Sequence, residues 1–151
     1  SGYRQRKGDE MKLFIDGEWN SYKGDLISLA LVSECGKEFY ESLGCENPDS
    51  WVAENVMPKL LNKPSITLGS LQEQLELYLS QFDAVHIIAD WPEDVAWFCT
   101  VMVTGAGTRI NTPPITFEIL REDTISDDPH NALSDAHGLR KWYMEKQNAT
   151  D

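Results

Sequence analysis

The sequence lacks any apolar run that approaches the roughly 18–20 residues of a membrane-spanning helix. Its first ten residues are polar and of mixed charge, so they do not read as a secretory signal peptide. It has only three cysteines, Cys35, Cys45 and Cys99, at spacings that suit neither a disulfide framework nor a metal site. These absences predict a cytoplasmic protein that is not embedded in a membrane or stabilised by disulfides.

Basic residues are also scarce, because 13 Lys and Arg stand against 25 Asp and Glu, giving a net charge of −12. Such a chain does not coat nucleic acid or an acidic membrane by general attraction, which needs basic surface. It can act on a phosphate chain if bound cations neutralise a local group of carboxylates. The question is therefore whether some of its acids are placed to hold metal ions.

What remains is ordinary globular composition, with 41% hydrophobic and 25% charged residues in 151. This length predicts one domain with its own core. Residues 1–10 have no apolar periodicity, and Met11 begins an apolar segment. We therefore expect residues 1–10 to be a loose arm or a remnant foreign to the natural chain, and residues 11–151 to form the domain.

Apolar patterning predicts the order of helices and strands. The expected strands are residues 12–16, 26–32, 37–43, 84–89 and 116–120. Expected helices begin near Trp51, with a break at Pro58, at a capping box Ser70-Leu71-Gln72-Glu73, at Pro92 and after the cap Asn131. Three leading antiparallel strands followed by alternating helices and strands predict an α/β fold, a mixed sheet flanked by helices.

Acidic residues stand at the ends of two predicted strands. Asp16 and Glu18 flank Gly17 at the end of the first strand, and residues i and i+2 of a strand share a face. Asp90 and Asp94 follow the fourth strand and begin a helix. Each pair has a structural alternative, a solvated turn for the first and stabilisation of a helix N-terminus for the second.

A third segment, His130-Asn131-Ala132-Leu133-Ser134-Asp135-Ala136, begins the last helix. Taken alone, its histidine reads as a surface residue. The combination of the three segments resembles the DEDDh exonucleases of the ribonuclease H-like superfamily, which include RNase T and oligoribonuclease. Their third motif commonly reads His-x-Ala-Leu-x-Asp-Ala, as residues 130–136 do here.

Further segments are similar to a compact bacterial and phage subgroup of 3′–5′ exoribonucleases. They are Leu26-Ile27-Ser28, Lys37-Glu38-Phe39-Tyr40, Trp51-Val52 and Val56-Met57-Pro58-Lys59-Leu60. In the middle motif, the family pattern Asn-x-x-Phe-Asp places Asp90 at the asparagine position and Asp94 at the functional aspartate. Asp94 is the preferred assignment, and Asp90 is kept as its rival.

This resemblance implies the roles of the site residues. It implies two Mg²⁺ or Mn²⁺ ions held by Asp16, Glu18, Asp94 and Asp135, and His130 as general base. It also implies that Trp19 contacts the terminal nucleotide, although its indole could instead pack on the sheet edge. Asn20 and Trp91 are further candidates for binding the substrate. The remaining histidines, His86 and His137, are interpreted as structural.

The expected function is a 3′–5′ exoribonuclease that releases nucleoside monophosphates from single-stranded or 3′-overhanging RNA. Both the polarity and the RNA preference come from the resemblance, which also implies a homodimer. The alternatives are a DNA exonuclease using the same site, a trimming enzyme for conjugated nucleotides, and a catalytically silent descendant that binds nucleic acid or protein. The presence of all five motif residues argues against the silent descendant.

Overall fold

The protein, described here by a computed structural model over residues 10–60, 62–121 and 129–150, is built on a mixed five-stranded sheet in the order β3-β2-β1-β4-β7. The strands are β1 (Met11–Trp19), β2 (Leu26–Ser33), β3 (Glu38–Ser42), β4 (Val85–Ala89) and β7 (Ile115–Ile119). Strands β1, β2 and β3 pair antiparallel, whereas β4 pairs parallel with β1 and with β7. The α/β class and the three leading antiparallel strands are thus confirmed.

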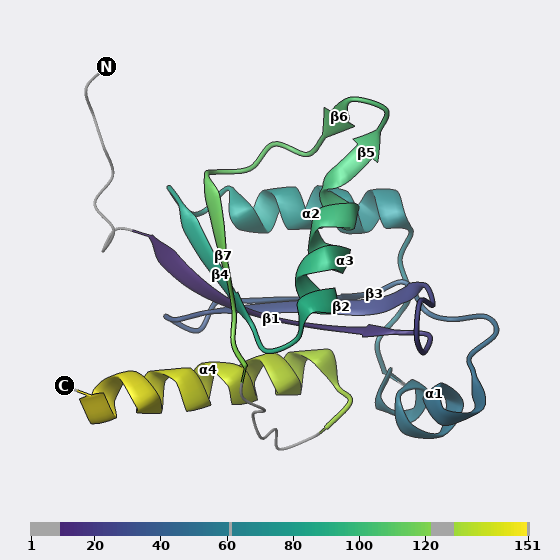
Figure 1. Cartoon of the computed structure of the whole chain (residues 1–151). Helices are drawn as coiled ribbons and strands as arrows, with labels where there is room; N and C mark the ends of the chain where they lie inside the picture. The colour runs from purple at the N-terminus through teal and green to yellow at the C-terminus, as the bar shows by residue number, and fades with distance from the viewer. Residues whose placement is uncertain (1–9, 61, 122–128, 151) are drawn as a thin grey trace.

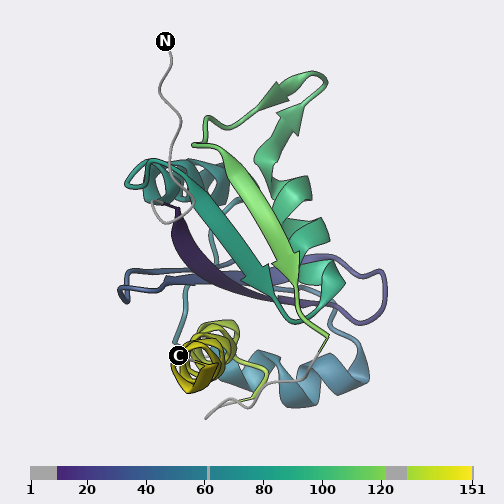
Figure 2. The same cartoon turned by 60° about the vertical axis from the view of Figure 1, so that its left-hand side comes forward.

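Helices cover both faces of the sheet (Figures 1 and 2). One face carries α2 (Leu68–Leu79) and α3 (Pro92–Met102), and the other carries α4 (Ala132–Thr150). Short helices α1 (Ser50–Asn55) and η2 (Met57–Leu60) pack beside Ile27 of β2. No helix in these described ranges is long and apolar enough to cross a membrane.

The period-two alternation of β1 decides which side chains enter which core. Leu13 and Ile15 are buried in the main core beneath α2 and α3. Phe14 points to the opposite face, where it packs with Ile88 and with Leu139 of α4. Continuing the same alternation, Asp16 and Glu18 follow Phe14 on the α4 face.

One local expectation is wrong, and two local features were not predicted. Helix α2 begins at Leu68, because the Thr67 side chain caps it by accepting a hydrogen bond from Ser70 N at 3.1 Å. Trp51 does not join the buried side of α1 and is 53% exposed. After α3, the chain forms an unpredicted hairpin of β5 (Val103–Gly105) and β6 (Thr108–Arg109).

The carboxyl ends of β1 and β4 lie at the same edge of the sheet because these strands are parallel. Helix α3 begins three residues after β4, at this edge. The first turn of α4 packs across β2, where Ala132 and Ala136 contact Ala30 and Val32. Segments far apart in the sequence therefore meet where β1 carries its acids. The expected loose arm falls on residues 1–10, of which 1–9 lie outside the described residues.

Candidate metal centre

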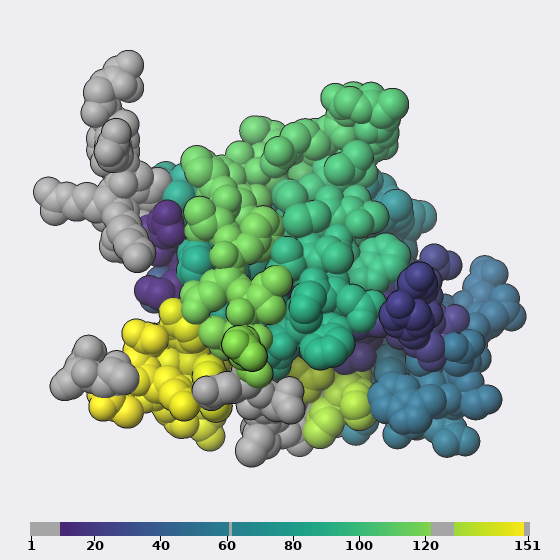
Figure 3. All heavy atoms as spheres, viewed as in Figure 1, coloured from purple at the N-terminus to yellow at the C-terminus, as the bar shows by residue number. Residues whose placement is uncertain are grey.

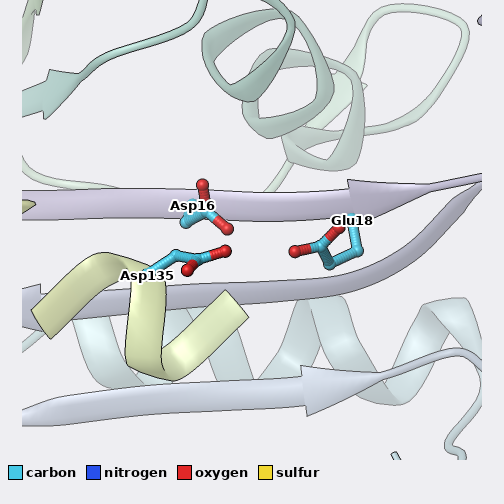
Figure 4. A group of neighbouring side chains, drawn as sticks. All are labelled: Asp16, Glu18 and Asp135. Carbon is cyan, nitrogen blue, oxygen red and sulfur yellow. The ribbon is translucent and has the colours of Figure 1, made fainter. Parts of the chain in front are cut away.

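Two acids of β1 and one acid of α4 converge. Asp16 and Glu18 share a strand face, as predicted, and Asp135 approaches them from the first turn of α4 (Figure 4). One carboxylate oxygen from each of the three lies within 4.8 Å of the others. The sequence separates Asp135 from β1 by more than a hundred residues, so the fold alone brings this group together.

A second group consists of Asp16, Asp90 and Asp94, again with one oxygen from each within 4.8 Å of the others. Asp94 is only 1% exposed, and its Oδ1 accepts a hydrogen bond from Gly17 N of β1 at 3.1 Å. This contact crosses from α3 to the sheet, so Asp94 does more than favour the N-terminus of its own helix. The structure thus brings both acids of the middle motif, treated as rivals in the sequence, to Asp16.

The crowding of these acids opposes their ionisation. Burial, followed by the charges of Asp94, Glu18 and other nearby acids, raises the pKa of Asp16 well above its usual range. Burial, the charge of Asp135 and a hydrogen bond with it raise the pKa of Glu18 to about 8. The pKa of Asp94 is likewise raised by burial and by Asp90, although the Gly17 amide partly offsets this. Ionisation of all these carboxylates therefore destabilises the folded protein unless a cation binds between them.

The donor set fits divalent cations. Asp16 Oδ2 and Asp94 Oδ2 are buried and accept no hydrogen bond from any described residue. A buried carboxylate oxygen without a partner is destabilising, and a cation removes that cost. Because all the ligand atoms are carboxylate oxygens, they suit the hard ions Mg²⁺ and Mn²⁺. Acidic residues that can bind a metal ion are therefore present where they were predicted.

His130 lies beside the group without being part of it. Its backbone has a left-handed φ of 69°, and its N–H donates to Asp135 Oδ2 at 3.2 Å. Its ring packs edge-on against Trp51, with ring centroids 4.8 Å apart. The predicted cap is confirmed, because Asn131 Oδ1 accepts a hydrogen bond from Ser134 N at 2.9 Å.

The three residues predicted to contact nucleotide have different surroundings in the structure. Trp19 lines a hollow of about 310 Å³ that also includes Glu18 and Glu93. Asn20 instead connects two loops, donating to Asn47 O at 3.0 Å and accepting from Asp49 N at 2.8 Å. Trp91 is 54% exposed, and its indole N–H donates to Glu93 at 3.0 Å.

The sequence did not indicate two further aromatic residues of this hollow, Tyr22 and Trp51. The space-filling view shows the β1–β2 connection lying directly above α1 at the right-hand side of the molecule (Figure 3). Tyr22 is 80% exposed, and nothing in its local sequence marks it as functional. The signal available for Trp51 was a large aromatic residue in the first turn of a short predicted helix.

Comparison with known proteins adds no assignment. No protein-family model matches the chain, and no curated protein sequence matches it. Functional inference therefore depends on the motifs and on the geometry described above.

Proposed function

We propose that this protein is a metal-dependent 3′–5′ exonuclease of the DEDDh type, preferring RNA and releasing nucleoside monophosphates. The observation that carries the proposal is the convergence of Asp16, Glu18, Asp94 and Asp135 from three separate segments. These are the four acids that the motif resemblance implied. Asp16 belongs to both carboxylate groups, as expected of an acid that serves two adjacent ions.

The sheet supports the same proposal. The order β3-β2-β1-β4-β7, with β1 central and antiparallel only to β2, fits the ribonuclease H-like arrangement that the resemblance implies. In this arrangement β1 supplies the first two acids, and the segment after β4 and the start of α4 supply the others. A scaffold of strand and helix ends holds ligands more rigidly than loops do.

In the proposed site, Asp16, Glu18 and Asp135 hold one ion, and Asp16 with Asp94 holds the second. When bound, the two ions supply Lewis-acid polarisation of the phosphate and stabilisation of the attacking and leaving oxygens. The Gly17 N–H fixes Asp94 by its bond to Oδ1 and leaves Oδ2 available as a ligand. The contribution of the protein is to fix the positions of the carboxylates and to supply the negative charge that holds the ions.

His130 is the proposed general base. Histidine side chains exchange protons near neutral pH, so one ring nitrogen takes a proton from the attacking water. The water oxygen forms a bond to the phosphorus of the terminal nucleotide as the P–O3′ bond breaks. The leaving O3′ takes up a proton, and the products are a nucleoside 5′-monophosphate and a shortened chain with a 3′-hydroxyl. The hydrogen bond from His130 N to Asp135 keeps the base beside the acids.

The aromatic hollow next to Glu18 suits a terminal base. Bases stack on aromatic rings without sequence preference, and Trp19, Tyr22 and Trp51 are available there. Binding through stacking and bound cations is compatible with a net charge of −12, because it does not require basic surface. A homodimer, implied by the resemblance, would enlarge the surface available to substrate.

The test uses labelled RNA and DNA with free or blocked 3′ ends, with and without Mn²⁺. We expect monophosphate release from free 3′ ends only, faster on RNA, and abolished by a chelator. Faster release from DNA would replace the RNA preference with the DNA alternative. Binding without release of monophosphate would favour the silent descendant. Light scattering that gives 17 kDa at micromolar protein would exclude the homodimer.

A further inference from the structure

Asp90 occupies an unusual position relative to Asp94. Both contribute an oxygen to the group that contains Asp16, so the start of α3 brings two carboxylates to this centre. Asp90 directly follows β4 and is partly buried, whereas a solvated acid at a helix N-terminus points into water. The negative charge of Asp90 therefore acts directly on Asp94 and Asp16.

Bringing a third acid to two buried acids is destabilising unless a cation lies between them. Asp94 is 1% exposed, and its Oδ2 accepts no hydrogen bond within the described residues, as is also true of Asp16 Oδ2. In addition, no described Lys or Arg forms an ion pair with Asp16 or Asp94. Because both unpartnered oxygens belong to members of the Asp16–Asp90–Asp94 group, they point to a cation bound there, independently of the clustering itself.

We propose that Asp90 is a direct ligand of the second ion, so that Asp16, Asp90 and Asp94 form a three-carboxylate site for Mn²⁺ or Mg²⁺ beside the Asp16–Glu18–Asp135 site. The inference rests on the proposed function, to which it adds a fifth acid. Its consequence is tight retention of the second ion, since three anionic oxygens favour a divalent cation more than two do. With five acids against two divalent ions, the centre keeps one excess negative charge.

The experiment titrates chelator-treated protein with Mn²⁺ alone and measures binding by calorimetry. Wild type should bind two ions. Asp90→Asn should weaken one of them by at least ~10-fold, because loss of even an outer partner of a metal site typically costs 10–100-fold. Asp83→Asn is the matched control, because Asp83 is an exposed acid at the opposite end of β4, and it should bind Mn²⁺ as wild type does.

Melting temperature separates a ligand from a structural acid. Without metal, Asp90→Asn should melt at or above the wild-type temperature, because one repelling charge is gone, and it should gain less from Mn²⁺. A lower metal-free melting temperature with unchanged Mn²⁺ affinity would show a structural acid and overturn the inference. If wild type and Asp90→Asn both bind two ions equally, only the inference fails. If wild type binds no Mn²⁺, the proposed function fails with it.

Discussion

Two polar clusters lie near opposite ends of the parallel strands β1 and β4. At one end, His86 of β4 contacts Thr116 at 2.6 Å and Glu118 at 3.0 Å through its two ring nitrogens. At the other end, Asp16 and Asp94 each keep a buried oxygen that no described residue satisfies. In the first cluster a histidine contacts a hydroxyl group and a carboxylate. In the second cluster the neighbouring groups are all carboxylates, which repel one another when they are charged.

The contrast separates polar groups that satisfy one another from polar groups that leave buried atoms without a partner. Buried polar atoms are normally satisfied, and even the partly exposed His86 uses both ring nitrogens in hydrogen bonds. The acidic cluster violates this rule at two atoms and raises the pKa of its own members, so it costs stability in the metal-free protein. We infer that the His86 cluster has a structural role and that the acidic cluster binds a cation.

The largest expected effect comes from replacing the acid shared by both carboxylate groups. Asp16→Asn should lower monophosphate release by about 10⁴-fold or more, since each ion supplies several kcal/mol of transition-state stabilisation. His86→Ala, in the satisfied cluster, should stay within a few-fold of the wild-type rate. Steady-state rates on labelled RNA measure both. Equal losses in the two variants would remove the distinction between the clusters.

His130 should produce the next largest effect. His130→Ala should lower turnover by about 10²–10⁴-fold, the usual range for positioned proton transfer. Mn²⁺ affinity should not change, because imidazole is absent from the proposed ligand set. The acidic limb of the pH–rate profile should flatten, because the group that must lose a proton is gone.

Two histidines serve as controls for this variant, since His86 contacts Glu118 and His137 contacts Glu38. His86→Ala and His137→Ala should both keep the acidic limb. A His130→Ala variant with normal rate and pH profile would exclude it as the base, even with all the acids confirmed.

Much of the fold could be predicted from the sequence because local rules agreed with the tertiary structure. The run Leu13-Phe14-Ile15 is buried on both faces and forms a central strand, and Asn131 caps its helix as its type favours. The capping box at Ser70 was misplaced because Thr67 offers an equivalent hydroxyl three residues earlier. Local patterns cannot rank two such caps.

The sequence indicated which acids belong to the candidate site, but only part of their spatial arrangement. The i, i+2 rule placed Asp16 and Glu18 on one face, as the structure has them. No local rule could place Asp90 and Asp94 beside Asp16, because that proximity depends on the parallel pairing of β1 with β4. The packing of His130 against Trp51 joins segments 79 positions apart and is likewise a product of the tertiary fold.

Metal binding should offset the loss of stability that the acidic cluster causes in the metal-free protein. Mn²⁺ at about 100 times its Kd should stabilise the protein by about 2.7 kcal/mol through mass action. Asp16→Asn should lose most of this gain, whereas His86→Ala should keep it. Thermal melts with and without Mn²⁺ measure the difference. A melting temperature indifferent to millimolar Mn²⁺ in wild type would contradict a cation site.

The pH dependence of the metal-free protein should show the same repulsion. Between the ordinary pKa of glutamate, 4.5, and the raised pKa of Glu18, about 8, the native state holds a proton that the unfolded chain has lost. Stability should therefore fall as pH rises through this window, by up to about 1.4 kcal/mol per pH unit for each such group. Denaturant titrations of chelator-treated protein measure the slope, and Glu18→Gln should reduce it, leaving the contributions of Asp16 and Asp94. A slope of the opposite sign would show that these carboxyls are stabilised in charged form.

The smallest expected effect concerns Asn131, which supports the acidic cluster without belonging to it. Its side chain accepts from Ser134 N, and its own carbonyl accepts from Asp135 N, so it fixes the turn that carries His130 and Asp135. Asn131→Ala should cost about 1 kcal/mol of unfolding free energy, the usual value of an N-cap. Turnover should fall as well, because both proposed catalytic side chains lose their fixed position, whereas Asn131→Ser should restore stability and rate together. Loss of stability with an unchanged rate would show that the cap serves the fold alone.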